Sequence, residues 1–206
     1  MRRGDRRDRV APRAPPRPPL HPRPVRIWDI SRSLAPGAWV WPGDTPYDCG
    51  LVTKIAEGAT VNVGRLAMSC HCGTHMDAPL HFADGAPGAE QIPLENCIGP
   101  CEVLPLDRLE EATAERVLIK AAGGAPAVEQ LDRLAVLKLF GTDFHSVDPM
   151  ESKTLEAHHH LWKRGAVILE ELDLAAIPYG HYELIALPLR LVGMDASPVR
   201  AVLIER

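Results

Sequence analysis

The chain has 206 residues, 46% of them hydrophobic, which is enough apolar material for one domain of ordinary size with a buried core. Its net charge of −4 is unevenly placed, because residues 1–26 hold nine arginines against two aspartates and the remainder carries 14 basic and 25 acidic side chains. An acidic domain of this kind excludes nucleic acid as the expected substrate, since a DNA or RNA binder needs a basic surface.

The lack of a recognisable targeting segment and the cysteine usage together predict a cytoplasmic protein. No apolar run approaches the length of a membrane span, and the N-terminus lacks the apolar core of a signal peptide. The five cysteines are odd in number and form no Cys-x-x-Cys pair, which argues against a disulfide framework and against a structural zinc finger. We therefore expect a cytoplasmic protein with no membrane association and with reduced, mostly buried thiols.

The first part of the chain divides into an extension and the start of a fold. Residues 1–26 are rich in arginine and proline and offer almost nothing to bury, so they are expected to be a disordered extension to a domain over residues 27–206. A short strand pattern follows at residues 26–30, and an aromatic strand end at residues 39–41 precedes a proline- and glycine-rich turn. Trp41 fits either the core or an exposed stacking surface on a rigid loop.

The remaining elements are mostly short strands. Residues 61–69 alternate like a half-buried strand, and further strands are expected at 101–106, 116–120, 136–140, 166–169, 182–187 and 199–204. Helical patterns occur at 109–115, at the start of 128–140 and at 155–162. Many short strands with few helices and no internal repeat predict an α+β fold on a mixed or antiparallel sheet.

Residues 71–81, which read HCGTHMDAPLH, concentrate three imidazoles and one carboxylate. These are ligands that zinc and manganese accept. His71 and His75 would share one face of a helix, but Gly73 and Pro79 oppose a regular helix. His75 and Asp77 would point the same way from an extended segment, so we predict a bent loop or strand end on which both converge with His71. A polar turn would explain any one of these residues alone, but not the set.

Two other places can complete such a site. A metal held by two histidines and one aspartate still lacks a fourth ligand or a partner metal. The adjacent histidines at 158–160 fan out around a helix by about a third of a turn each, so only one is expected to reach a site, and a solvated histidine run is the alternative. Glu170 and Glu171 end an apolar strand, where at least one carboxylate must point out of the core.

These residues resemble a known family. The run HCGTHMDAPLH is similar to the HxGTHxDxPxH motif of the cyclase-like metal-dependent hydrolases. The segments IWDIS, VWPGDTP, DPMESKTLEAHHH, AVILEEL, YELIALPLRL and DASPVRAVL resemble the bacterial kynurenine formamidases within that family, so the likeness covers most of residues 26–206. The resemblance implies a swivelling β/α-type domain and a homodimer.

The resemblance also implies roles for individual residues. Two zinc ions per subunit are implied, with manganese as the alternative metal. His71, His75 and Asp77 match the ligands of one zinc ion, and Asp77 is also placed to bridge. The other implied roles are His158 and Glu170 as ligands of the second zinc ion, with Glu170 as a further bridging candidate, His81 as the catalytic proton donor and acceptor, and Trp41 as a substrate-contacting aromatic.

The implied reaction is hydrolysis of N-formyl-L-kynurenine to formate and L-kynurenine in tryptophan degradation. An anilide leaves poorly as an anion, so an acid such as His81 must protonate its nitrogen, while Trp41 stacks on the aryl ring. The stretch 128–141 departs from the resemblance, as though a helix and its approach loop were trimmed, and Phe144-His145 replaces a Thr-Pro-like turn. The substrate wall or the subunit contact would differ there.

Three alternatives stay open from the sequence. A related amide or cyclic-imide hydrolase, such as an isatin-hydrolase-like enzyme with manganese, would use the same ligand set. A catalytically silent metal-binding protein would keep the ligands, although it has no need of a base such as His81. A cysteine hydrolase would use Cys70 or Cys72 with a neighbouring histidine, but no separate orienting partner is evident.

Overall fold

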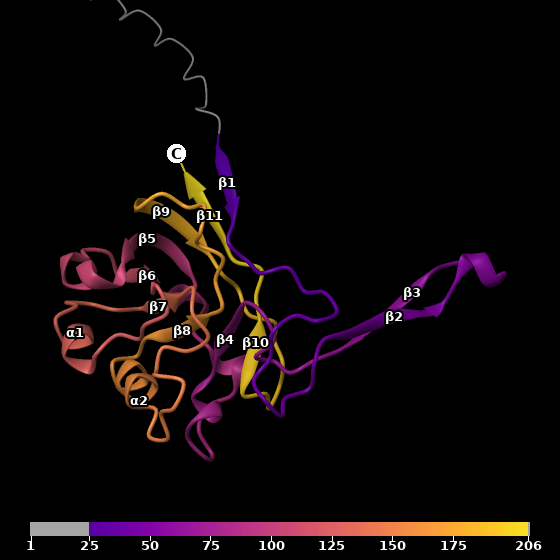
Figure 1. The fold of residues 1–206 in the computed structure, drawn as a ribbon, viewed down its shortest axis with the longest axis horizontal. Helices are drawn as coiled ribbons and strands as arrows, with labels where there is room; N and C mark the ends of the chain where they lie inside the picture. The colour runs from indigo at the N-terminus through magenta and orange to yellow at the C-terminus, as the bar shows by residue number, and fades with distance from the viewer. Residues whose placement is uncertain (1–24, 206) are drawn as a thin grey trace, which may run out of the picture.

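The protein folds around one curved mixed sheet (Figure 1). The computed structural model describes residues 25–205. Its strands are β1 (Arg26–Asp29), β2 (Asp48–Thr53), β3 (Val63–Ala67), β4 (His75–Asp77), β5 (Ile98–Pro105), β6 (Arg116–Lys120), β7 (Leu139–Thr142), β8 (Val167–Glu170), β9 (Gly180–Ile185), β10 (Ala196–Pro198) and β11 (Val202–Glu205). The α-helices are α1 (Val128–Asp132) and α2 (Glu156–Lys163), and 3-10 turns occupy Ile55–Glu57, Pro79–His81, Ala89–Gln91, Leu94–Asn96 and Leu106–Glu111.

Nine strands form the main sheet in the order β1-β11-β9-β5-β6-β7-β8-β4-β10. The central strands β5, β6, β7 and β8 run parallel, and every other neighbouring pair is antiparallel. Parallel neighbours need crossover connections, and the segments carrying α1 and α2 supply two of them. The sheet is thus mixed with few helices, which confirms the predicted α+β class.

Each face of the sheet has its own core, because successive strand residues point to opposite sides. In β6 the side chains of Val117 and Ile119 join one buried cluster with residues of both helix segments, including Leu131 and Leu161. Leu118, between them, joins the second cluster on the other face. The helices cover one face of the sheet, so the strand end at Glu170 and the helix α2 lie near one another.

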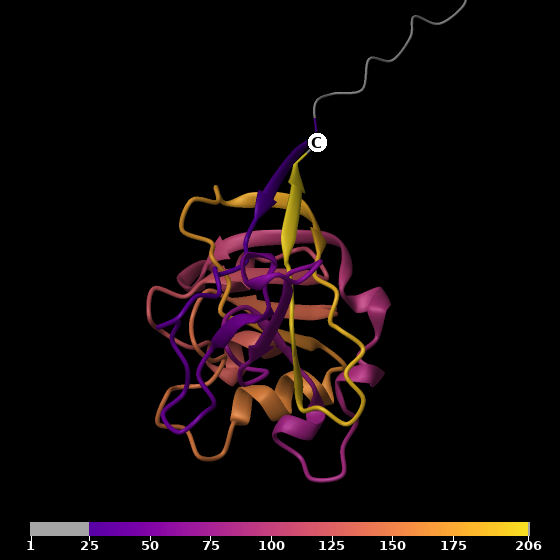
Figure 2. The same cartoon turned by 90° about the vertical axis from the view of Figure 1, so that its right-hand side faces the viewer.

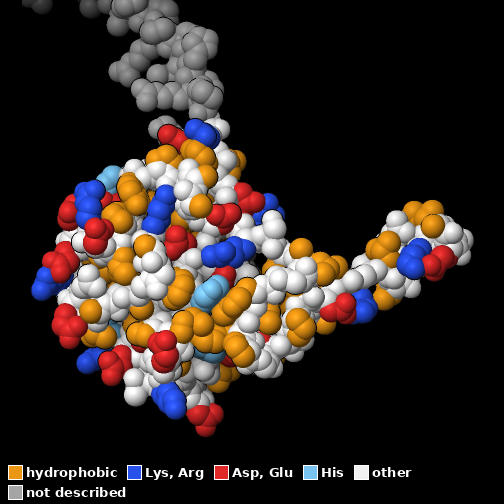
Figure 3. Space-filling view, in the orientation of Figure 1, with side chains coloured by type: hydrophobic (Ala, Val, Ile, Leu, Met, Phe, Trp, Pro, Cys, Tyr) orange, Lys and Arg blue, Asp and Glu red, His pale blue; other side chains and the backbone are white. Residues whose placement is uncertain are grey.

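Strands β2 and β3 form a separate two-stranded hairpin that extends away from the body (Figure 1). In the view turned by 90° this arm, residues 48–67, points toward the reader (Figure 2). Hydrophobic side chains gather along it in the space-filling view (Figure 3). Leu51, Val52, Val63 and Leu66 are all exposed. The arm is therefore exposed on both faces along most of its length.

Most sequence expectations for local structure agree with these elements, and three do not. Residues 61–69 were expected to be half-buried, but β3 is exposed along its whole length because it belongs to the arm. Residues 39–41 form no strand. The helix expected at 109–115 is instead a 3-10 segment at Leu106–Glu111 that contains a kink at Arg108.

Other expectations concern the chain end and the cell compartment. The expected extension over residues 1–26 lies outside the described residues except for its last two, and Arg26 already begins β1. Within residues 25–205 no helix has the length and apolar character needed to span a bilayer. All five cysteines are free, with three of them buried, Cys70 half-buried and Cys49 exposed. The cytoplasmic location stays a prediction.

Candidate metal centre and active site

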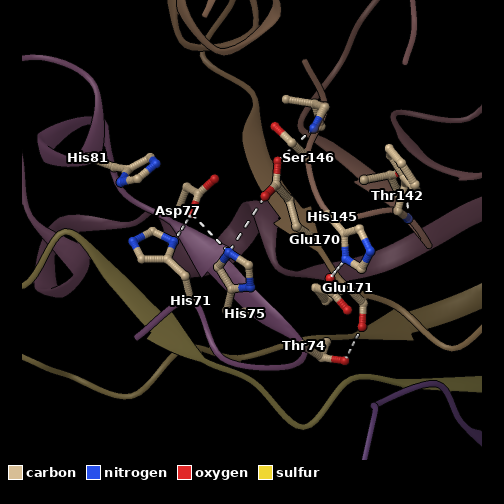
Figure 4. Close-up of polar contacts among 12 residues, drawn as sticks. His71, Thr74, His75, Asp77, His81, Thr142, His145, Ser146, Glu170 and Glu171 are labelled. Atoms are coloured by element: carbon tan, nitrogen blue, oxygen red, sulfur yellow. Dashed lines mark hydrogen bonds and ion pairs between the residues drawn. The ribbon is translucent and has the colours of Figure 1, made fainter. Parts of the chain in front are cut away.

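Strand β4 carries the centre of the site. It lies between β8 and β10, and His75 is paired with Glu170 of β8 in the antiparallel register. His75 and Asp77 are two residues apart and therefore project from the same face of the sheet, while Met76 between them points into the core on the other face. His71 lies in the turn before β4, as the sequence indicated. Figure 4 shows His71, His75, Asp77 and Glu170 turned toward one another.

The two oxygens of Asp77 divide the surrounding donors into two sets. Asp77 Oδ1 lies 3.2 Å from Nδ1 of His71 and 3.4 Å from Nε2 of His75. Asp77 Oδ2 lies 3.3 Å from Nε2 of His158, which in turn lies 3.5 Å from Oε1 of Glu170. The buried triads His71-His75-Asp77 and Asp77-His158-Glu170 are each close enough for one ion. A carboxylate shared in this way can bridge two metals.

The outward nitrogen of each histidine is held by an oxygen acceptor. His75 Nδ1 lies 2.8 Å from the carbonyl oxygen of Gly73, and His71 Nε2 lies 3.0 Å from Asp195 Oδ2. His158 Nδ1 lies 2.6 Å from Asp148 Oδ2. A metal-binding histidine characteristically donates its other ring N–H to a carboxylate or carbonyl, which fixes the tautomer and the ring orientation. The nitrogen left over points inward in all three cases.

The inward-pointing atoms lack hydrogen bonds. His75 Nε2, His158 Nε2 and both oxygens of Asp77 are buried without a hydrogen-bond partner among residues 25–205. Buried polar atoms are normally satisfied, so a cluster of four that face one another needs an additional group. A divalent cation fits, because imidazole nitrogens and carboxylate oxygens are its preferred ligands. The donor set therefore matches a metal centre.

The charge balance of the site leads to the same conclusion. Burial raises the pKa of Glu170 to about 7, and the neighbouring Asp77 carboxylate adds to the rise. Burial opposes a charged His158, but the carboxylates of Asp148 and Asp77 outweigh it and raise its pKa to about 10. Burial likewise disfavours a charged His71, but the carboxylates of Asp77 and Asp195 outweigh it and raise the pKa of His71 to about 9. Protons thus compensate a negative site that a metal ion would compensate when bound.

Only one of the three adjacent histidines faces the donor cluster, as the fan of side chains around a helix predicts. His158 is 1% exposed and faces Asp77, whereas His159 is exposed and the ring of His160 lies 3.1 Å from Asp132. Helix α2 is oriented by Asp148, whose carboxylate accepts hydrogen bonds from the backbone N–H groups of Ala157 and His158. One aspartate thus holds both the helix start and the ring of His158.

Replacing Asp148 by asparagine is expected to lower the affinity for metal roughly 10- to 100-fold, the usual cost of losing the partner of a ligand histidine. The physical reason is that His158 loses both its orientation and part of its basicity. Competition with a chromophoric chelator measures the affinity. Asp132→Asn is the matched control, because Asp132 contacts His160, which lies on the same helix as His158 but belongs to neither triad. Unchanged affinity in Asp148→Asn would contradict the assignment of Asp148.

His81 lies at the mouth of the site. Its side chain is 32% exposed, and its Nδ1 lies 3.5 Å from Asp195 Oδ2. His71, His81 and Asp195 form a third group of potential ligands, but a metal there would need the nitrogen of His71 that faces Asp195 while the other faces Asp77. Asp195 accepts the hydrogen bond of the His71 ring and lies beside the His81 ring. Burial lowers the pKa of His81, which favours the neutral imidazole that can accept a proton.

Glu171 supports the other side of the site. Its backbone has φ +57°, an uncommon left-handed conformation for a residue with a side chain. Figure 4 shows the Thr74 hydroxyl, which donates a 2.6 Å hydrogen bond to the Glu171 carbonyl oxygen, and His145, which pairs with the Glu171 carboxylate. The same carboxylate pairs with Arg32 at 2.6 Å. These contacts hold the chain at the residue after Glu170, which faces the donor cluster.

A cavity of about 350 Å³ opens beside the donors. Its apolar wall includes Trp41, Met150 and Leu155, and its polar lining includes His81, His158, Glu170 and three serines. Trp41 is half-buried, with its ring edge against Trp39, which stacks on His145 at 3.7 Å. Among the described residues, none from 128–141 lines this cavity.

All seven residues singled out in the sequence surround this cavity or the donor cluster beside it. Five of them are the donors of the two triads, and His81 and Trp41 line the cavity. Sequence reasoning missed Asp148 and Asp195, which orient the rings, and Asp44, which lines the cavity. Asp195 contacts a histidine 124 positions away, so no local pattern indicated it.

Comparison with known proteins extends these observations. The Cyclase family model matches residues 28–123. A kynurenine formamidase from Erythrobacter litoralis is 42% identical in an alignment that covers 87% of this chain and 94% of that protein. The structure of a predicted metal-dependent hydrolase from Bacillus stearothermophilus is 26% identical with a TM-score of 0.71, covering 88% of this chain and 99% of that one.

Isatin hydrolase A from Labrenzia aggregata, bound to benzyl benzoate, has a TM-score of 0.74 at 22% identity over 87% of this chain and 93% of that one. At that identity the likeness concerns the fold alone. The identity to the formamidase extends over most of both chains, and each of the two triads could hold a metal ion. The chain therefore belongs to the cyclase-like family of metal-dependent hydrolases.

Proposed function

We propose that this protein is an arylformamidase that hydrolyses N-formyl-L-kynurenine to L-kynurenine and formate, with two zinc ions per subunit. The observation that carries the substrate assignment is the 42% identity to a kynurenine formamidase across 87% of the chain. The donor triads joined by Asp77 support the two ions, with manganese as the alternative metal. The aryl substrate suits a cavity that has Trp41 in its wall.

The residues of the cavity can divide the chemistry among them. The two triads would hold a metal pair, which would supply polarisation of the formyl carbonyl and a water acidic enough to lose its proton at neutral pH. His81 accepts that proton and then donates it to the anilide nitrogen, because an anilide leaves poorly unless it is protonated. Asp195 lies on the Nδ1 side of the His81 ring, which leaves Nε2 for the proton transfers.

A single assay tests this proposal. The purified protein is given N-formyl-L-kynurenine and isatin in parallel, and the metal content of the same sample is counted. Release of kynurenine that a chelator abolishes and zinc restores is the expected result. Opening of isatin without release of kynurenine would refute the substrate. Bound metal with neither reaction would favour a catalytically silent metal-binding protein, and activity that survives chelation would refute the metal dependence.

The proposal includes a homodimer, which the exposed arm supports. Leu51 and Leu66 on the arm are 49% and 64% exposed and contribute nothing to the core of the body. Replacing both by serine is expected to convert the dimer to a monomer without loss of fold, as measured by light scattering and circular dichroism. Val192→Ser, at an exposed residue outside the arm, is the control. A monomeric wild-type protein, or a dimer that persists in the double variant, would contradict this role.

A further inference from the structure

The turn that carries Trp41 also carries a carboxylate into the cavity. Residues 41–44 read WPGD, Gly43 has φ +100°, and the N–H of Asp44 donates a 3.0 Å hydrogen bond to the carbonyl oxygen of Trp41. Proline followed by a glycine with positive φ is the signature of a type II turn. Trp41 and Asp44 are the two ends of this turn, and both line the cavity. An indole and a carboxylate are therefore presented side by side on a rigid support.

Asp44 is held in place through one of its two oxygens. Oδ2 accepts a 2.8 Å hydrogen bond from the Ser69 hydroxyl, and the N–H of Ser69 donates a 2.9 Å hydrogen bond to the carbonyl oxygen of Thr45. Among residues 25–205, the other oxygen, Oδ1, accepts no hydrogen bond and neither oxygen has a cationic partner. The side chain is half-buried, so its charge faces the cavity and is only partly screened by water.

The cavity has carboxylates but no lysine or arginine among its lining residues in the part of the chain that the structure describes. Of its three carboxylates, Glu170 belongs to a donor triad and Asp195 contacts His71 and His81. Asp44 alone remains available for a ligand. A carboxylate beside an aromatic ring suits an aryl compound whose side chain carries a cation, since the ring face can also attract that cation.

We propose that Asp44 determines specificity by binding the ammonium group of the substrate, so that the preferred substrates are formanilides with a protonated amine in the side chain. This inference rests on the proposed function, because N-formyl-L-kynurenine carries such an amine. Asp44 binds and orients the substrate without taking part in bond cleavage. Its loss is therefore expected to raise KM for amine-bearing substrates more than it lowers kcat.

The test compares N-formyl-L-kynurenine with its deaminated analogue, which keeps the formanilide and the carboxylate. In Asp44→Asn an oxygen remains to accept the Ser69 hydroxyl, but the charge is removed. The ratio of kcat/KM for the amine-bearing over the deaminated substrate is expected to fall roughly 10- to 100-fold, as for loss of a hydrogen bond to a charged group. Asp48→Asn is the matched control, because Asp48 pairs with Arg65 on the arm, and its ratio is expected to stay at the wild-type value.

An equal loss for both substrates would show that Asp44 only shapes the turn, and an unchanged ratio would place the ammonium elsewhere. Either result overturns the inference while the hydrolysis of both formanilides leaves the proposed function intact. A wild-type enzyme that opens only isatin overturns both. Inhibition of the wild-type protein by L-kynurenine and by its deaminated analogue tests the inference without a variant: about tenfold tighter inhibition by L-kynurenine is expected, and equal inhibition refutes it.

Discussion

Replacing His81 by alanine is expected to lower kcat by about 10² to 10⁴ while the metal content stays at the wild-type value, because this is the usual contribution of a general acid–base residue. His81 lines the cavity but belongs to neither buried triad. Its Nδ1 lies 3.5 Å from Asp195 Oδ2, and the centroid of its ring lies 4.1 Å from that of the His71 ring. Steady-state kinetics and metal analysis of the same preparation measure the two effects separately.

The metal content decides between two roles for this residue. If His81 were a ligand in the group His71-His81-Asp195, its removal would cost metal as well as turnover. His181→Ala is a suitable control, because that histidine is 68% exposed and lies on β9 away from the cavity. Full activity in His81→Ala would overturn the assignment of the proton donor and acceptor.

Replacing Asp77 by alanine is expected to abolish both metal binding and activity. Asp77 is the residue common to the two triads, and its oxygens face His71 and His75 on one side and His158 on the other. Without it, each ion would lose a charged ligand and three imidazoles would remain around a buried cavity. Metal analysis after dialysis, together with circular dichroism to verify the fold, measures the outcome.

Asp77→Asn refines this experiment because it preserves the volume of the side chain and removes only its charge and one acceptor oxygen. We expect it to retain the fold and to lose at least one of the two ions. Asp84→Ala is the control, since Asp84 is an exposed carboxylate in the loop after His81. Two metals per chain in Asp77→Ala would refute the bridging role.

The parts of the site that the sequence predicts are those governed by a local rule. The two-residue spacing of His75 and Asp77 in an extended segment fixed their common direction. The end of an apolar strand indicated that Glu170 or Glu171 would point out of the core, and only the family resemblance selected Glu170. His158 was separable from its two neighbours only through the family resemblance, because the orientation of α2 depends on its contact with Asp148.

The arm shows why alternation alone is ambiguous. Residues of β3 alternate between apolar and polar, as a strand with one face on a core would. In the structure β3 pairs only with β2, so neither face is covered by the body. An alternating pattern predicts a strand with one apolar face. It does not indicate whether that face packs against the same chain. Long-range contacts such as that between His71 and Asp195 are hidden for the same reason.

The cavity is lined by segments of the folded core and by a surface turn. The metal donors come from β4, β8 and α2 and the turn before β4, whereas Trp41 and Asp44 come from a surface turn that contributes nothing to either core. Substitutions in that turn can therefore alter which molecule is accepted without a large cost in folding free energy. Reactivity and selectivity can evolve independently in such an arrangement, and a change of substrate requires only a new turn facing an unchanged catalytic centre.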